Sequence, residues 1–389
     1  MEVSSRLILL AALAFGVAPP AWSNDELTET PELFAVTIGG NTVNLDGLVI
    51  KKFDAQGNLP IALFTNGDQT LATAGGGAAT TTATYAPYAR DLARRGWLAV
   101  VALRRGFGKS DGPKPNPIAC QADSLNAWAT AAADDLQATI NFIARRPDAD
   151  AGKVLVIGSE IAGVAAVALS ARNPPGLIAV ISVSGGLESE SKCPMQDILV
   201  GAFKDYGANS RVPNLWMYSK SDKTFDPDFA ERLHSTFLDG GGDVKFVTFF
   251  RTGDVGTAIF SKAKSAWYGQ MDGFLQWNNL PSWSTADAQN IATKLKITDS
   301  IEQGSFADYM VQFYFAEPGE KALAFSPSLQ AAWSAPPNNV VAPPRLPIWN
   351  AFNGPTIDDA RKIALTSCQK TAQDCVIVME NFRWVGDSQ

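Results

Sequence analysis

Two carboxylates follow apolar runs of the chain, and they are the first candidates for chemistry. Glu160 comes after VLVIGS and before the small-residue run IAGVAAVALS, which predicts a buried strand, a sharp turn and a helix. Asp222 comes shortly after the apolar run NLWMY. A pair of carboxylates in one pocket can divide acid and base roles, or can bind a cation. No spacing in the sequence supports either use, so both remain open.

Hydroxyl chemistry needs a base, and the chain has a single histidine. His234 lies in the helical pattern FAERLHSTFL, and we expect it on the flank of the fold, away from a site. Ser159 and Ser110 are candidates for an unrecognised nucleophile. If Ser159 stood at the tip of the turn, bulky Ile157 and Ile161 would crowd it, so the pattern favours Glu160 at the tip.

Strand and helix patterns alternate around these residues. We expect a doubly wound, mostly parallel α/β sheet, entered by an antiparallel hairpin over residues 33–52. Ligands of such sheets bind beyond the carboxyl ends of the strands. The expected strands cover residues 61–65, 97–103, 154–157, 177–183, 214–218 and 244–250. The expected helices cover residues 85–95, 134–145, 227–238 and 265–277.

The alternation breaks near residue 283, and we expect a second, smaller α+β domain from there on. The sequence therefore predicts a large domain over residues 24–284 and a small one over residues 285–389. The small domain should contain helices over 305–315 and 357–368 and strands over 321–325 and 375–380, with a proline-rich loop at 336–347.

The N-terminus and the cysteines indicate export. Arg6, a short apolar run and the small residues before Asn24 are typical of a signal peptide, so we expect residues 1–23 to be removed. We expect a periplasmic or secreted protein of a bacterium. Four cysteines allow three pairings, and the sequence favours Cys368 with Cys375 and Cys120 with Cys193. Zinc is a weak alternative because there is no C-x-x-C pair.

The charge balance limits the partners. A net charge of −7 without a basic patch argues against nucleic-acid binding. The arginine pairs 94–95, 104–105 and 145–146 are interpreted as solvated surface or local salt bridges. After signal cleavage we expect no membrane contact, since no later stretch reaches about 18 apolar residues. A small molecule or an ester-like substrate is the expected partner, and no metal or cofactor is expected.

Residues 33–283 resemble α/β-hydrolases of the dienelactone hydrolase and serine esterase type. Three segments carry the resemblance: RRGWLAVVALRRGFGKSDG, DLQATINFIARRPDADAGKV and VLVIGSEIAG. The last is similar to the nucleophile elbow G-x-S-x-G, in which a serine stands on a strained strand-to-helix turn. The C-terminal part is similar to a small module appended to some secreted members, for which no activity follows.

The resemblance implies a site in which only the acid is kept. The nucleophile position falls on Glu160, the acid on Asp222, and the histidine position on Thr257 in GDVGTAIF. Asp254 is a candidate third acid, although a role in the turn is the simpler interpretation. The oxyanion-hole positions are Asn66, Gly67 and the N–H of Ile161. One hypothesis is that the Glu160 carboxylate itself fills that hole.

These substitutions predict a catalytically degenerate hydrolase fold that acts as a binding or accessory protein. Loss of both the nucleophile and the base removes the serine-triad chemistry. The alternative is an active hydrolase with a histidine-free site, built on Ser159, Ser110 or the Glu160/Asp222 pair. A third hypothesis makes the small domain the working part and the large domain its support.

Overall fold

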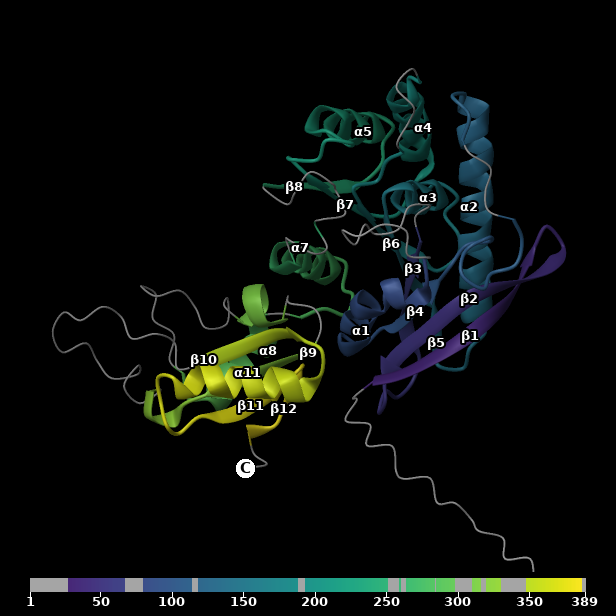
Figure 1. The fold of residues 1–389 in the computed structure, drawn as a ribbon. Coiled ribbons are helices and arrows are strands. Elements are labelled where there is room, and N and C mark those ends of the chain that lie inside the picture. The colour runs from purple at the N-terminus through teal and green to yellow at the C-terminus, as the bar shows by residue number, and fades with distance from the viewer. Residues whose placement is uncertain are drawn as a thin grey trace, which may run out of the picture.

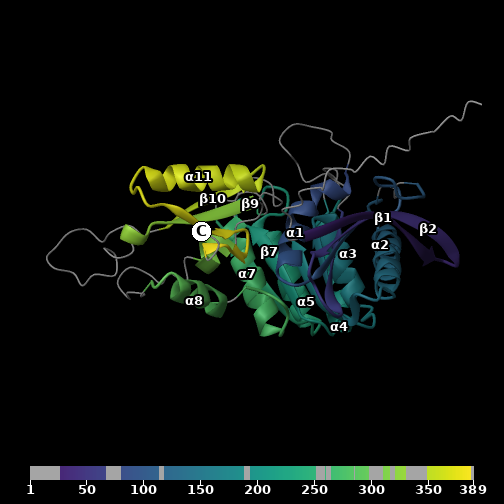
Figure 2. The same ribbon diagram turned by 90° about the horizontal axis from the view of Figure 1, so that it is seen from below.

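The computed structural model describes residues 27–66, 80–113, 118–187, 193–250, 259, 264–283, 285–297, 310–315, 320–329 and 348–386. Two β-sheets organise these residues, and helices pack on both faces of each (Figure 1; Figure 2 gives a second view). The predicted signal peptide and the proline-rich loop at 336–347 lie outside the described residues. No helix within the described ranges is long and apolar enough to cross a membrane.

The larger sheet has eight strands in the order β1-β2-β4-β3-β5-β6-β7-β8. The first two strands form the predicted antiparallel hairpin, β2 pairs antiparallel with β4, and all later neighbours are parallel. The strands are β1 (Leu27–Ile38), β2 (Asn41–Lys52), β3 (Leu59–Thr65), β4 (Leu98–Ala102), β5 (Ala149–Ser159), β6 (Leu177–Val183), β7 (Asn214–Ser219) and β8 (Val244–Phe249).

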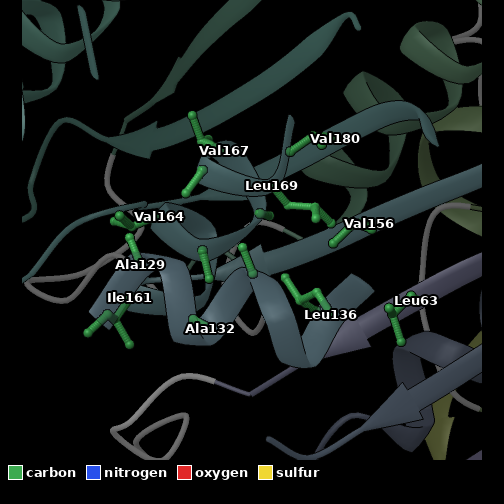
Figure 3. Packing of buried hydrophobic residues seen from close by; sticks show 14 of the residues in the cluster. Leu63, Ala129, Ala132, Leu136, Val156, Ile161, Val164, Val167, Leu169 and Val180 are labelled. Carbon is green, nitrogen blue, oxygen red and sulfur yellow. The ribbon is translucent and has the colours of Figure 1, made fainter. Parts of the chain in front are cut away.

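Helices cover both faces of the larger sheet, as predicted for a doubly wound fold. One face carries α1 (Ala86–Arg94) and α7 (Lys264–Trp277). The other carries α2 (Ala122–Ile143), α3 (Ile161–Ser170), α4 (Met195–Asn209) and α5 (Pro227–Asp239). Alternate strand residues supply the two cores: Val156 belongs to the core under α2 and α3, and Leu155 to the core under α1. Figure 3 shows the packing of the first core around α2 and α3.

Two helices differ from the expectation. α2 begins at Ala122, well before the predicted residue 134, because Leu125, Trp128 and Ala132 extend the apolar face by three turns. α4 (Met195–Asn209) was not predicted at all, and it packs beside α5 through residues such as Leu199 and Phe203. In α4 the apolar residues Ile198 and Val200 lie beside the buried face rather than on it, which weakens the periodic signal.

The smaller sheet has the order β10-β9-β11-β12 and is antiparallel throughout. The helix α11 (Ile357–Gln369) covers one face, and α8 (Thr285–Lys294) and the π-helix η2 (Met310–Phe315) cover the other. Its strands are β9 (Glu320–Phe325), β10 (Ile348–Gly354), β11 (Val376–Glu380) and β12 (Arg383–Trp384). Of these elements α8, β10 and β12 were not predicted, and the described part of the predicted 305–315 helix is η2.

The smaller sheet joins the larger one at the amino ends of the parallel strands. The buried guanidinium of Arg94, at the end of α1, binds Glu320 of β9 at 3.0 Å and Asp91 at 3.1 Å. The Trp97 indole N–H, just before β4, donates to the main-chain oxygen of Pro281 at 2.8 Å. Figure 1 shows the smaller sheet beside α1 and α7. The carboxyl edge, where ligands of this architecture bind, is at the other end of the strands.

Candidate active site

Glu160 stands on a strained turn between β5 and α3. Its backbone has φ 51° and ψ −127°, a conformation that a residue with a side chain seldom adopts. The neighbouring main chain holds it there: the Glu160 N–H donates to Val183 O at 3.0 Å, and Glu160 O accepts from the N–H groups of Gly163 and Gly186. The turn therefore places Glu160 at the carboxyl edge of the sheet, where the residue is partly exposed.

The close contacts of Gly158 and Gly163 show that Glu160 is at the tip of this turn. A Cβ on Gly158 would lie 2.2 Å from the main-chain oxygen of Ala162, and one on Gly163 would lie 2.4 Å from the Ser182 hydroxyl oxygen. Small residues are thus required two before and three after Glu160. Ser159, in contrast, is the last residue of β5, buried and paired with Val183. The alternative register with Ser159 at the tip disagrees with this backbone.

Asp222 lies at the same edge, just past β7. It is 4% exposed, and its Oδ1 accepts from the N–H groups of Thr224 and Phe225 at 2.9 and 3.1 Å. Strand β6 lies between β5 and β7, so Asp222 and Glu160 follow strands that are about 10 Å apart. The two carboxylates share an edge, and a residue after β6 stands between them.

That residue is Ser184, which the sequence analysis did not single out. Ser184 follows β6 with φ 48°, is fully buried, and its hydroxyl has no hydrogen-bond partner among the described residues. The next residue is held by Tyr218, whose hydroxyl donates to Gly185 O at 2.6 Å. Burial raises the pKa of Tyr218, and the nearby Asp222 charge raises it further. Tyr218 therefore stays a neutral donor at physiological pH, and it fixes the loop that packs on Glu160.

Asn66, the predicted oxyanion residue, is tied to an arginine. Asn66 follows β3 and is fully buried; its Oδ1 accepts from the main-chain N–H of Arg104 at 2.8 Å. The Arg104 Nε donates to Asn66 O at 3.2 Å, and the guanidinium packs over Phe107 and Trp128. The edge thus carries a buried positive charge on one side of Glu160 and a buried carboxylate on the other.

The arginine pairs were expected to be solvated surface or local salt bridges, and three of their members are buried. Arg94, Arg95 and Arg104 are 1%, 6% and 2% exposed. The alternative, local salt bridges, holds for Arg94 and Arg95, and also for Arg105, whose Nε binds Asp135 at 2.6 Å. Arg104 lies two residues past the apolar strand LAVVA, which places it at the carboxyl edge, but nothing local in the sequence shows that it is buried.

The remaining candidates for nucleophile and base lie in structural roles. His234, on α5, stacks on Phe246 of β8 with ring centroids 4.5 Å apart and faces Glu231 at 3.4 Å. It lies on the flank, as expected. The Ser110 hydroxyl donates to Leu103 O and accepts from the Asp46 N–H, both at 2.8 Å. Ser110 therefore closes a turn.

Several predicted positions lie outside the described residues. These are Gly67, Asp254 and Thr257, so their site roles stay predictions. The Glu160 side chain makes no capping hydrogen bond to α3, while the N–H of Ile161, the predicted second oxyanion donor, begins that helix. Whether the carboxylate fills the oxyanion hole therefore also stays a prediction.

Both predicted disulfides are confirmed. Cys120 and Cys193 are bonded with Cα atoms 5.5 Å apart, and they join the loops that precede α2 and α4 near the carboxyl edge. Cys368 and Cys375 are bonded between α11 and β11. No cysteine is free, and among the described residues no group of three potential metal ligands occurs. Disulfides of this kind are typical of oxidising compartments.

The strand order and the strained turn after β5 identify the larger sheet. Its strand-to-helix turn, with small residues on both sides, has the geometry of a nucleophile elbow at the edge of a mostly parallel sheet. In addition, residues 55–200 match the family model of X-Pro dipeptidyl-peptidases (S15 family), a stretch that includes Glu160. The larger domain has the α/β-hydrolase fold.

Solved structures with a similar α/β-hydrolase fold include a Klebsiella pneumoniae protein named as a dienelactone hydrolase. It is 19% identical, with 66% of this chain and 99% of that chain covered and a TM-score of 0.47. An esterase of Pyrococcus furiosus is 13% identical over 64% of this chain and 90% of that chain, with a TM-score of 0.47. An acetyl xylan esterase from Paenibacillus is 12% identical over 62% and 84%, with a TM-score of 0.45. No curated protein matches the sequence.

Proposed function

We propose that this chain is an exported α/β-hydrolase-fold protein without serine-triad activity, which acts as a binding or accessory protein. The observation that carries the proposal is Glu160 at the tip of the elbow, in the left-handed backbone conformation of that turn. A carboxylate there offers no hydroxyl to acylate. The fold is kept, and the residue that the fold normally presents to an ester is changed.

The lack of a histidine that could serve as the catalytic base also supports the proposal. The sequence contains one histidine, and that residue stacks on Phe246 on the flank of the sheet. A carboxylate nucleophile would form an ester intermediate, and water would then need a base to hydrolyse it. No imidazole is in place for that step, so even a Glu160 ester would not turn over at a useful rate.

A second candidate function is hydrolysis by a histidine-free site. The observation in its favour is the Ser184 hydroxyl, buried on the edge between Glu160 and Asp222 in a strained conformation. Strained, buried polar residues concentrate at functional sites. This candidate requires that a carboxylate accept the serine proton in place of imidazole.

A fluorophosphonate probe separates these two functions, since it labels only an activated hydroxyl. We expect no labelling of the purified wild-type protein. The double variant Glu160→Ser/Thr257→His, which restores the two changed triad positions, should become labelled at position 160. Labelling of the wild type that disappears in Ser184→Ala or Ser159→Ala, but not in Ser110→Ala, would contradict the proposal and favour the histidine-free hydrolase.

Export can be tested separately. The two disulfides favour an oxidising compartment, and the N-terminal pattern favours cleavage after Ser23. Expression of the full chain in a bacterium, followed by fractionation and intact-mass measurement, should give a periplasmic or secreted protein that begins at Asn24. A cytoplasmic product that retains Met1 would contradict export.

A further inference from the structure

An aromatic cavity lies in the smaller domain, away from the elbow. Its volume is about 530 Å³, within the range of small-molecule sites. Helix α8 provides one wall, and the β11–β12 hairpin, Trp283 and η2 provide the others. The lining residues are Trp283, Asn290, Ile291, Thr293, Lys294, Phe315, Met379, Phe382 and Trp384.

The aromatic wall of this cavity is preformed. The Trp283 ring stacks on Phe382 at 4.6 Å and on Phe315 at 4.9 Å between centroids. Phe382 is in turn held from behind by Lys321, whose ammonium lies 4.0 Å from the ring centroid. Rings that are already stacked lose little conformational entropy when a ligand binds, so the wall suits a flat or compact apolar group.

One cation lies at the cavity among the described residues. The ammonium of Lys294 is 4.8 Å from the Trp384 ring centroid, and Lys294 makes no ion pair with another described residue. None of the described lining residues is a carboxylate. The indole N–H groups of Trp283 and Trp384 are buried within the wall, so a ligand in the cavity does not reach them.

We propose that this cavity binds a monocarboxylate with an apolar, ring-sized body. The body would lie against the aromatic wall formed by Trp283, Phe315 and Phe382. The carboxylate would accept from the ammonium of Lys294 and would supply a negative charge that no described lining residue supplies. The site is independent of Glu160 and of the proposed loss of catalysis, because it belongs to the smaller domain.

Titration calorimetry with naphthoate and its neutral amide, naphthamide, tests the proposal on the full mature protein. We expect naphthoate to bind more tightly than naphthamide. Lys294→Gln should weaken naphthoate about fivefold and leave naphthamide nearly unchanged, because a charge-assisted hydrogen bond is lost only with the acid.

Matched controls exist on the same chain. Lys362 is exposed on α11, on the opposite face of the smaller sheet, and Trp277 is 88% exposed at the end of α7. Lys362→Gln and Trp277→Phe should leave naphthoate binding unchanged, as should Glu160→Gln. Unaltered melting temperatures would show that each variant is folded. Failure of naphthoate to bind the wild type, equal binding of acid and amide, or unchanged binding in Lys294→Gln would overturn the proposal.

Discussion

At the scale of single residues, the elbow is held by steric exclusion and main-chain hydrogen bonds. A non-glycine residue at φ 51° costs roughly 1–3 kcal/mol, and it persists only where the surroundings allow no other conformation. Here Val183 O fixes the N–H of Glu160, while Gly158 and Gly163 admit the close approach of α3 and β6. The strained turn thus carries a glutamate at its tip.

A pair of glycine substitutions tests this packing. Gly158→Ala should destabilise the protein by about 3 kcal/mol, because the new methyl would overlap the main-chain oxygen of Ala162, which cannot move alone. Gly201→Ala, in the middle of α4 with no atom near its added methyl, should stabilise by about 0.5–1 kcal/mol. Urea denaturation measures both. A Gly158→Ala protein as stable as the wild type would contradict the described turn.

The position of Glu160 could be predicted from the sequence, whereas the role of Arg104 could not. The small residues Gly158 and Ala162 around Glu160 restrict the turn to one register, and this signal is local. Arg104 is charged, and charge alone suggests a solvated side chain. Its burial depends on Phe107, Trp128 and Asn66, and two of those lie more than 20 residues away, so no local pattern reveals it.

At the scale of elements, the strands were easier to predict than the helices that cover them. β6 matches its expected range, residues 177–183, since a strand buried on both faces is a continuous apolar run. α4 was missed because apolar residues such as Ile198 and Val200 lie outside its buried face and weaken the amphipathic pattern. β10 was missed because it lies in the smaller domain, where the expected patterns were weak.

The contact between α11 and the β11–β12 hairpin predicts a pH effect. Glu380 accepts from Arg361 at 2.5 Å and from Arg383 at 2.9 Å; these bonds, above all that from Arg361, hold its pKa below the usual range. A carboxyl whose pKa is lower in the folded than in the unfolded protein stabilises the fold at pH values above its unfolded-state pKa. This stabilisation is lost as the pH falls through the folded-state pKa. Partial exposure limits the amount to about 1 kcal/mol.

Glu380→Gln should therefore lower the stability near pH 7 and flatten its loss on acidification below about pH 5. Thermal unfolding between neutral and acidic pH measures the effect. Glu231→Gln, at an exposed site of α5, provides the control and should leave the acid limb unchanged. An acid limb in Glu380→Gln as steep as that of the wild type would show that this carboxylate does not contribute.

At the scale of the whole molecule, the two sheets are joined at the amino ends of the strands, opposite the elbow. Arg94 is buried and faces both Asp91 and Glu320, and Arg95 binds Asp272 through two hydrogen bonds of 2.8 Å. Asp272 also accepts a hydrogen bond from the main-chain N–H of Trp283, where the chain enters the smaller domain. The described part of the smaller domain is thus docked at the amino ends of the strands, away from the carboxyl edge that carries Glu160.

Loss of the ion pair between the domains should loosen this docking. Glu320→Gln removes one of the two carboxylates that neutralise the buried guanidinium of Arg94. We expect the free energy of unfolding to fall by about 2 kcal/mol. In calorimetry the smaller domain should then unfold before the larger one. Glu32→Gln breaks a more exposed pair with Arg146 and should cost less than about 1 kcal/mol in a single transition. Equal losses of unfolding free energy in the two variants would contradict the burial of the Arg94–Glu320 ion pair.

The central claim is that the hydrolase scaffold is intact and its serine chemistry is lost. The most direct measurement is hydrolysis of short p-nitrophenyl esters by the mature wild type, Glu160→Ser, Glu160→Ala and Glu160→Ser/Thr257→His. The account predicts an inert wild type and turnover only in the double variant, which regains both nucleophile and base. Turnover by the wild type that Glu160→Ala abolishes would contradict the account and assign a histidine-free mechanism to Glu160.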